Sequence, residues 1–511
     1  MLSKVWSLSL KGIEGFLVGV EVDISSGLPS FSIVGLPDAG IKESRDRIIA
    51  ALKNSGFDFP TKRITVNLSP AEVKKAGTHF DLPIALGIIF ASGQIPAQSR
   101  HKLEKTAFIG ELALNGDIRH AVGVLPMVIS LKGSTLVEGV VVPEENEAEA
   151  CISGVKSFHA KSIRDIAGFF AGSAELKPCR KTEKYSVQES MPDFSEVKNQ
   201  MLAKRALEIA AAGFHNVIMV GPPGSGKSML AKRFSSILPP LSIDEMLEIS
   251  KIYSVSGIAE LNQAPSRPFR EPHHSISDAA LIGGGQNPRP GEISLAHNGV
   301  LFLDEFPEFS RPAIESLREP MESWKVTISR VREAVSYPAR FILIAAMNPC
   351  PCGYSGHPLR ECDCTPLQIH KYRSKISGPI LDRIDIHVSL SPIKYAEWAD
   401  LKSSEPSKNI RERVMNALER QGKRFKNSAM RANSFMDSSC IKKFCPIPNE
   451  AGRILESAMN RFGFSARSLD KILKVSRTIA DLDSSDEIKK EHVIEAVQYR
   501  LLDKAMELSV C

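Results

Sequence analysis

Near the middle of the chain the sequence reads Gly221-Pro222-Pro223-Gly224-Ser225-Gly226-Lys227-Ser228. This stretch fits the pattern G-x-x-x-x-G-K-[ST], follows the apolar run Val217–Val220 and precedes a predicted helix over residues 228–238. A strand, a glycine loop and a helix in this order form a phosphate-binding loop, because backbone N–H groups and the positive end of the helix attract a phosphate. We therefore expect a nucleoside triphosphate here, with Lys227 at its β- and γ-phosphates and the Ser228 hydroxyl on Mg²⁺.

Two further apolar runs end in polar side chains that suit hydrolysis. The run Gly299–Leu303 has the pattern of a buried parallel strand and is followed directly by Asp304 and Glu305. We expect Asp304 to hold the Mg²⁺ shell and Glu305 to polarise the attacking water. The run Phe341–Met347 ends in Asn348, an uncharged group suited to orienting that water near the γ-phosphate. Either ending alone is also common in turns, but their order after the phosphate-binding loop favours an ATPase.

The order of these elements resembles the AAA+ ATPases, and two arginines extend the resemblance. One lies in a segment similar to the arginine-finger segment of the branch that contains Mg-chelatase motors and MCM helicases: Ser377-Gly378-Pro379-Ile380-Leu381-Asp382-Arg383-Ile384-Asp385. The other lies in a segment that resembles the second sensor of that branch: Ser465-Ala466-Arg467-Ser468-Leu469. The resemblance implies that Arg383 completes a neighbouring subunit's site, that Arg467 senses the γ-phosphate, and that subunits form a ring, commonly a hexamer. Without the resemblance, either arginine is interpreted as a surface ion-pair partner.

Nearly the whole chain resembles the ComM/YifB group of bacterial Mg-chelatase-like proteins. The resemblance depends on residues 1–170 joined to the motor, on Pro272-His273-His274-Ser275 and on a cysteine-rich segment. It implies a hexameric DNA motor that promotes branch migration while incoming single strands are integrated during natural transformation. One residue departs from the group, because Asn199 precedes Gln200 where the group usually has glycine, at the place where the base of the nucleotide packs.

The composition indicates a cytoplasmic protein with more than one core. The 511 residues are 43% hydrophobic, which is enough for two or three cores. The sequence has no apolar run of about eighteen residues and no basic-then-apolar start, so we expect neither a membrane protein nor a secreted one. Nine cysteines, unevenly spread, argue against a disulfide framework. The net charge of +6 is compatible with nucleic acid but is not diagnostic of it.

The patterns along the chain predict an α/β protein in four parts. Residues 1–170 alternate strand-like and helical segments and resemble the Lon-protease-like domain, a mixed α/β fold. Residues 171–192 are mostly polar and are interpreted as a linker. Residues 193–392 are expected to form the AAA+ core with its parallel sheet, and residues 393–511 a helical connection and a helical lid that carries Arg467.

Proteolysis by the first domain is not expected. A Lon-like protease needs a Ser nucleophile and a Lys base. The chain has Phe80 where that fold would place its Ser, and it offers no amine within residues 123–126, where the Lys would lie. His79 and Asp81 are interpreted as turn or packing residues, so a structural or DNA-guiding role is favoured for this domain.

Two segments are candidates for contact with DNA. An insertion over residues 241–295 carries arginines, glycines and the pair His273 and His274, for which packing or nucleotide-coupled contacts are favoured over metal binding. Residues 325–335 have the pattern of a hairpin that resembles the pore hairpin of MCM-type motors, with Arg330 and Arg332 near its tip. Cations there would follow the phosphate backbone with little sequence preference. The alternative is a solvated hairpin edge, on which charges discourage strand pairing.

A cysteine cluster follows Asn348 as two C-x-C pairs: Cys350 with Cys352, and Cys362 with Cys364. Four thiolates suit a closed tetrahedral site and favour Zn²⁺. The alternative is a set of free or redox-labile thiols, because C-x-C is tighter than the usual C-x₂-C spacing. A loop stiffened by zinc would present to DNA the basic side chains that follow it, Lys371, Arg373 and Lys375.

Together these patterns predict a cytoplasmic AAA+ ATPase that uses ATP and Mg²⁺, has zinc as a candidate structural metal, and moves as a ring along single-stranded and branched DNA. Two alternatives stay open. A remodelling motor of the Mg-chelatase type would act on a protein partner, and its ATP turnover would be indifferent to DNA. A DNA-binding scaffold would use ATP only to assemble, and Glu305→Gln would leave it fully active.

Overall fold

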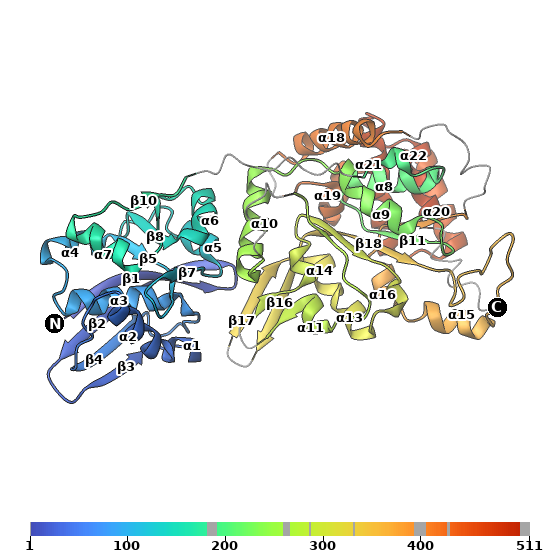
Figure 1. Cartoon of the computed structure of the whole chain (residues 1–511). Coiled ribbons are helices and arrows are strands. Elements are labelled where there is room, and N and C mark those ends of the chain that lie inside the picture. Colours follow the sequence, from blue (N-terminus) through green and yellow to red (C-terminus); the bar gives the residue numbers. More distant parts are fainter. Residues whose placement is uncertain are drawn as a thin grey trace.

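The computed structural model describes residues 2–180, 192–258, 266–285, 288–330, 333–392, 405–426 and 430–500 of the chain. Figure 1 shows a first domain at one end and a larger motor at the other, with the C-terminal helices on the motor. Both parts combine a central sheet with helices, so the α/β class predicted from the sequence is confirmed. Among the helices that the structure describes, none combines the length and the apolar character needed to cross a membrane.

The first domain is built on an eight-stranded mixed sheet that is covered on both faces. In β8, Val140 and Val142 join one hydrophobic core and Val141 joins the other, because successive side chains of a strand point to opposite faces. The strands β1, β2 and β4 are antiparallel neighbours, and β5, β8 and β9 extend the sheet in parallel. The strand order is β10 (Lys177–Pro178), β9 (Ser157–Ala160), β8 (Gly139–Pro143), β5 (Thr106–Phe108), β1 (Leu2–Lys11), β2 (Glu14–Ser25), β4 (Arg63–Ser69) and β3 (Ser30–Val34).

Helices of the first domain pack on the two faces of this sheet. On one face lie α2 (Ser44–Asn54), α3 (Asp81–Ala91) and α7 (Ile163–Ala171), and on the other α5 (Val124–Ile129) and α6 (Glu147–Ile152). Helix α3 is apolar on nearly all sides and almost wholly buried, as expected for a helix inside a core. The edge strand β10 lies within residues 171–192, so the sheet extends into the stretch that we predicted as a linker.

The motor has a five-stranded parallel sheet whose strands were largely visible in the sequence. All side chains of β11, β15 and β18 are buried, which explains why these strands are continuous apolar runs rather than alternating ones. The predicted helix after the phosphate-binding loop is shorter than expected: α9 (Lys227–Phe234) is followed by a short 3₁₀ turn, Ser235–Ile237. The strand order is β12 (Phe269–Arg270), β15 (Gly299–Leu303), β18 (Phe341–Met347), β11 (Val217–Val220) and β19 (Ile386–Ser389).

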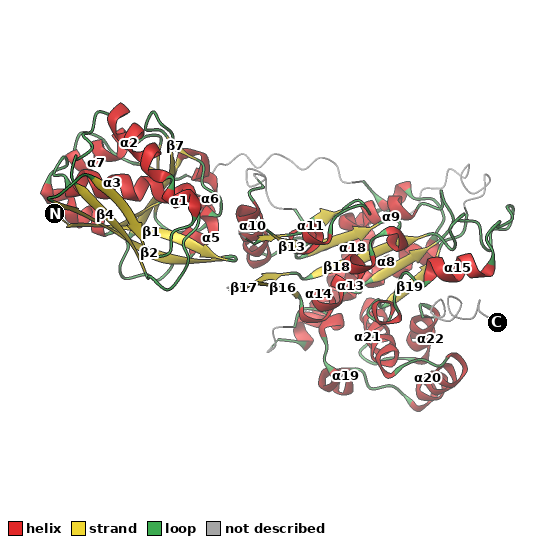
Figure 2. Cartoon of the chain, turned by 90° about the horizontal axis from the view of Figure 1, so that it is seen from below, coloured by secondary structure: helices red, strands yellow, loops and turns green. Residues whose placement is uncertain are grey.

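The C-terminal helices form a lid whose core is continuous with that of the motor sheet. Figure 2 shows α19, α20, α21 and α22 gathered on one side of the sheet. Gly463 ends α20 with a φ of 59°, and Ser465 caps α21 by accepting a hydrogen bond from the N–H of Ser468. The helices are α18 (Ser407–Arg424), α19 (Ser438–Phe444), α20 (Asn449–Phe462), α21 (Ala466–Leu482) and α22 (Lys490–Gln498).

The predicted hairpin is present as β16 (Lys325–Arg330) and β17 (Glu333–Pro338), paired antiparallel from Lys325 with Pro338 to Arg330 with Glu333. It lies on the side of the motor that faces the first domain, next to α10 (Ile243–Ser256) (Figure 1). The Gly123 N–H of the first domain donates to the Ser254 carbonyl of α10 at 3.1 Å. The first domain therefore contacts the predicted insertion, and the turn at Ile13 packs against the core beside the hairpin.

Candidate active site

The glycine loop joins β11 to α9 and has the conformation that phosphate binding requires. Gly224 and Gly226 have φ values of +75° and +90°, the left-handed region that disfavours other residues. The Ser225 hydroxyl is buried and has no hydrogen-bond partner among the described residues. A buried hydroxyl without a hydrogen-bond partner costs free energy, so this hydroxyl is suited to form a hydrogen bond with a ligand.

Lys227 lies in the first turn of α9 with its ammonium group directed into the loop. Its Nζ donates to the carbonyls of Gly221 at 2.7 Å and Pro222 at 3.0 Å, and to Asn348 Oδ1 at 3.1 Å. Burial lowers the pKa of Lys227, and the nearby Asp304 carboxylate opposes that shift. Lys227 and Asn348, both predicted for the nucleotide site, therefore lie together.

The predicted magnesium ligands are also together. Ser228 Oγ donates to Asp304 Oδ2 at 2.6 Å, although the two residues lie on different elements, α9 and the end of β15. A hydroxyl and a carboxylate beside a phosphate-binding lysine are the ligands that Mg²⁺ uses in phosphate-binding-loop ATPases. The chemistry of this donor set, with the open glycine loop next to it, fits a nucleotide with Mg²⁺.

Glu305 has a partner that the sequence did not reveal. Its backbone is left-handed, with a φ of 52°, and its side chain is 56% exposed. One carboxylate oxygen lies 3.1 Å from Nδ1 of His274, whose ring stacks on His273 with centroids 4.1 Å apart. His274 of this pair therefore contacts the predicted water-activating residue, and His273 packs on His274, in agreement with the expectation of packing or nucleotide-coupled contacts. The only signal in the sequence was the Pro272-His273-His274-Ser275 motif itself.

We expect His274→Ala to lower kcat for ATP hydrolysis by about 3- to 10-fold, because Glu305 loses the side chain that fixes its direction. The KM for ATP should stay within about 2-fold, since His274 has no contact with the glycine loop. Steady-state kinetics of His274→Ala and His273→Ala test this. His273 bonds Ser275 at 2.8 Å and not Glu305, so its removal should leave kcat within about 2-fold. Equal losses in both variants would contradict the positioning role.

Arg383 and Arg467 lie together, and both contact Glu322 of α14 (Arg318–Ser323). Arg383 Nη2 is 2.6 Å and Arg467 Nη2 is 3.6 Å from Glu322 Oε1. They line a cavity of about 240 Å³ between the motor and the lid, and no residue of the glycine loop lines it. In this arrangement Arg467 is grouped with Arg383, the predicted arginine finger, rather than with Lys227 of its own chain. Glu322 carried no signal in the sequence.

Asn199, the residue that departs from the group, has a conformation that explains how it replaces glycine. Its φ is 55°, within the left-handed region that asparagine tolerates better than most residues. Gln200, which follows it, donates to the carbonyls of Ser391 at 2.7 Å and Ser225 at 3.3 Å. The segment therefore reaches the glycine loop without a glycine at position 199.

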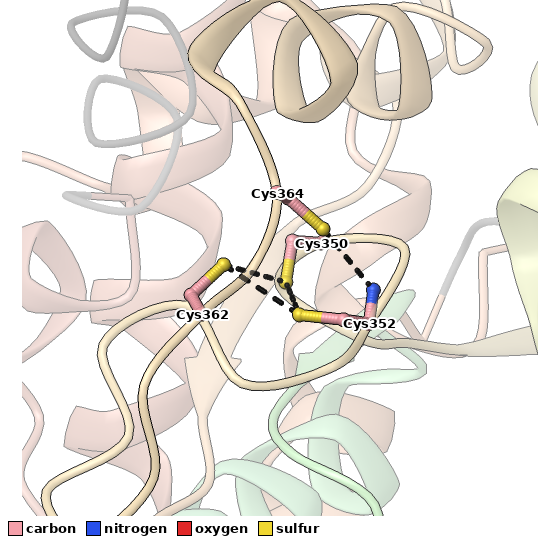
Figure 3. Close-up of side chains that lie close together, drawn as sticks. All are labelled: Cys350, Cys352, Cys362 and Cys364. Atoms are coloured by element: carbon pink, nitrogen blue, oxygen red, sulfur yellow. Dashed lines mark hydrogen bonds between the residues drawn. The ribbon is translucent and has the colours of Figure 1, made fainter.

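The four cysteines of the predicted cluster are brought together by the fold (Figure 3). Their sulfurs all lie within 4.8 Å of one another, and this is the one group of three or more potential ligands found among the described residues. His357 lies outside the cluster and accepts the N–H of Leu359. Of the candidate DNA contacts, the backbone of Arg330 lies in β16, while its side chain and the whole of Arg332 lie outside the described residues.

In the first domain, the residues around the position where a Lon-like protease would have its serine make structural contacts. Phe80 is fully buried in the core, and Asp81 accepts two hydrogen bonds from Arg47 at 2.7 and 3.1 Å. The His79 ring bonds the Leu8 carbonyl at 2.9 Å, and burial lowers the pKa of this histidine to about 4. His79 and Asp81 therefore serve packing, as predicted.

Comparison with known proteins places the chain in a family. The family model described as "Magnesium chelatase, subunit ChlI" matches residues 193–398; the models "Subunit ChlI of Mg-chelatase" and "Magnesium chelatase, subunit ChlI C-terminal" match residues 20–146 and 404–500. The chain is 43% identical to the protein YifB of Escherichia coli, over 99% of this chain and 98% of that protein. It belongs to the ComM/YifB family of magnesium chelatase-like AAA+ proteins.

A second relative supports the same assignment, and a more distant one matches part of the chain. The competence protein ComM of Haemophilus influenzae is 40% identical over 99% of both chains. The DNA replication licensing factor mcm6 of Dictyostelium discoideum is 24% identical over 58% of this chain and 32% of its own length. The family supports an ATPase that uses ATP and Mg²⁺.

Proposed function

We propose that this chain is the subunit of a cytoplasmic ring motor, commonly a hexamer, that uses ATP to promote branch migration in DNA recombination during natural transformation. The observation that carries the proposal is the end-to-end match with a competence protein. The contacts of Lys227 with Asn348 and of Ser228 with Asp304 support an ATP site in this chain. The partial match with a replication licensing factor supports action on DNA.

In the proposed reaction each residue of the nucleotide site has one task. Lys227 exchanges its carbonyl partners for phosphate oxygens, and Ser228 with Asp304 holds Mg²⁺, which neutralises developing charge when bound. Glu305 accepts a proton from the attacking water. Asn348, which accepts a hydrogen bond from Lys227, orients that water. Both tasks suit the positions of these residues at the ends of neighbouring parallel strands, β15 and β18.

Completion of the site by a neighbouring subunit is part of the proposal. Arg383 and Arg467 share Glu322 in a cavity that their own glycine loop does not line, so we assign both to the site of an adjacent subunit. An arginine supplied across an interface stabilises the charge of the transition state. A head-to-tail interface of this kind repeats until a ring closes.

We assign the β16–β17 hairpin, with Arg330 and Arg332, to DNA. Basic side chains at the tip of a hairpin contact phosphates without reading sequence, and such binding weakens steeply with salt. The hairpin begins three residues after Glu322, on which Arg383 and Arg467 converge. Nucleotide-dependent movement at that contact would thus be transmitted to the hairpin.

The test is a junction assay with three- and four-strand DNA. Wild-type protein with ATP and Mg²⁺ should move the junction and should hydrolyse ATP faster when DNA is present, whereas Lys227→Ala should do neither. The alanine variant is expected to lose most ATP binding because the phosphate-binding ammonium group is gone. Wild-type protein that neither shifts junctions nor gains ATPase activity from DNA would refute the proposal.

A second candidate function is remodelling of a protein partner, as in a magnesium chelatase motor. The family models favour it, since all three describe the ChlI subunit of that enzyme. The two functions differ in one measurable quantity. ATP turnover that is unchanged by DNA, and is raised by a protein partner, would select the remodelling motor.

A further inference from the structure

We propose that Cys350, Cys352, Cys362 and Cys364 bind one zinc ion, and that this ion holds the catalytic Asn348 and the glycine loop in their working positions. The cysteine loop, residues 349–364, begins directly after β18 and leads into α15 (Pro366–Arg373). The proposal concerns the ATPase site alone, so it does not depend on whether the partner is DNA or a protein.

The four sulfurs already have nearly the spacing of a zinc site. Cys350 Sγ lies 3.3 Å from Cys352 Sγ and 3.6 Å from Cys362 Sγ, and the latter two are 3.5 Å apart. In a tetrahedral site with Zn–S bonds of about 2.3 Å, sulfurs lie about 3.8 Å from one another. Small shifts of these three sulfurs, and of Cys364 Sγ, which lies within 4.8 Å of each of them, would therefore convert the observed cluster into a closed four-sulfur site (Figure 3).

The surroundings of the sulfurs favour a metal over four unbound thiols. The Cys352 N–H donates to Cys364 Sγ at 3.4 Å, and the Ser355 N–H donates to Cys350 Sγ at 3.3 Å. Backbone N–H groups directed at sulfur orient thiolate ligands and stabilise their charge. All four cysteines are free in the structure, and Cys350 is fully buried, where a cation offsets the cost of bringing sulfur charge out of water.

The cluster is joined to the catalytic site through a very short connection. Only Pro349 separates Cys350 from Asn348, whose Oδ1 accepts a hydrogen bond from Lys227 at 3.1 Å. The Pro349 carbonyl in turn accepts a hydrogen bond from Nε of Arg373 at 3.0 Å. This bond joins the start of the cysteine loop to α15, the helix that follows the loop. An ion that fixes Cys350 would thus limit the movement of Asn348.

The cysteine loop also touches the glycine loop. Gly353 has a φ of +85°, and a Cβ added there would lie 2.6 Å from Pro223 Cδ, so the Gly353 backbone closely approaches the proline ring of the glycine loop. Gly356, in the same loop, has a similar φ of +75°, but a Cβ there would meet nothing within 4 Å. Alanine substitutions at these two positions can therefore be compared. Both would strain the backbone, but only the one at Gly353 would press on the glycine loop.

The first experiment measures zinc in the purified full-length protein by elemental analysis. Wild type should hold about one zinc ion per chain, and Cys352→Ser/Cys362→Ser should hold almost none. Cys440→Ser, which removes a half-buried cysteine of the lid outside the cluster, should keep the ion. Wild-type protein without zinc, or zinc retained by the double variant, would overturn the assignment.

The second experiment asks whether the ion supports catalysis. Removal of zinc by a chelator from wild type, with folding followed by circular dichroism, should lower kcat by about 10-fold or more, and added zinc should restore it. Gly353→Ala should keep its zinc and lose kcat to a similar extent, whereas Gly356→Ala should stay within about 2-fold of wild type. Folded, zinc-free protein with full activity, or equal activity of the two glycine variants, would overturn the supporting role.

Discussion

Arg383→Ala is expected to lower kcat for ATP hydrolysis by about 10³-fold or more, because an arginine that stabilises the transition-state charge across an interface makes a contribution of that size. ATP affinity should change by less than about 3-fold, since Arg383 contacts Pro379 and Glu322 and not the glycine loop. The measurement is kcat under saturating ATP together with equilibrium binding of a fluorescent ATP analogue.

The matched control for Arg383 is Arg100→Ala. Arg100 forms an exposed ion pair with Glu104 at 3.1 Å in the first domain, and exposed pairs contribute little. This variant should keep kcat within about 2-fold of wild type. If Arg383→Ala were as active as Arg100→Ala, the arginine would be a surface ion-pair partner, which is the alternative that the sequence left open.

Glu305→Gln is expected to bind ATP normally and to hydrolyse it about 10²- to 10³-fold more slowly, because the amide cannot accept the proton of the attacking water. Asp304 and Ser228 are unaltered, so Mg²⁺ binding should be retained. A rapid-quench measurement of the hydrolysis step, beside ATP binding, separates the two effects.

Glu308→Gln serves as the control for Glu305. Glu308 lies in the same 3₁₀ turn and pairs with Lys375 at 2.9 Å, and both side chains are more than two-fifths exposed. Its kcat should remain within about 2-fold of wild type. Full junction movement by Glu305→Gln would show instead that ATP serves only assembly, as in the scaffold alternative.

The nucleotide site was predictable because its residues occupy fixed places relative to buried strands. Lys227 follows β11, Asp304 follows β15 and Asn348 follows β18, and in a parallel sheet these strand ends meet at one edge. The strands themselves were visible as unbroken apolar runs, since both faces of the sheet are covered. The apolar pattern of each strand therefore also predicts where the side chain that follows the strand lies in the fold.

The contacts that complete the site were not predictable, because they join elements far apart in the chain. The His274–Glu305 pair connects the insertion to the end of β15, and Glu322 joins Arg383 to Arg467 of the lid. Neither contact has a sequence spacing that follows from helix or strand geometry. The edge strand β10 was not predicted for another reason. It has only two residues, the second of which is proline, and such a pair shows no strand pattern.

The central claim is that each ATP site is completed by an arginine of the next subunit, and a mixing experiment tests it most directly. Lys227→Ala and Arg383→Ala should each be nearly inactive alone. In equal mixture, with mixed oligomers verified by two affinity tags, about one interface in four would join an intact glycine loop to an intact Arg383. We predict recovery of about a quarter of wild-type ATPase activity, and none when Lys227→Ala is replaced by the double variant Lys227→Ala/Arg383→Ala. Verified mixed oligomers that stay inactive would contradict the account.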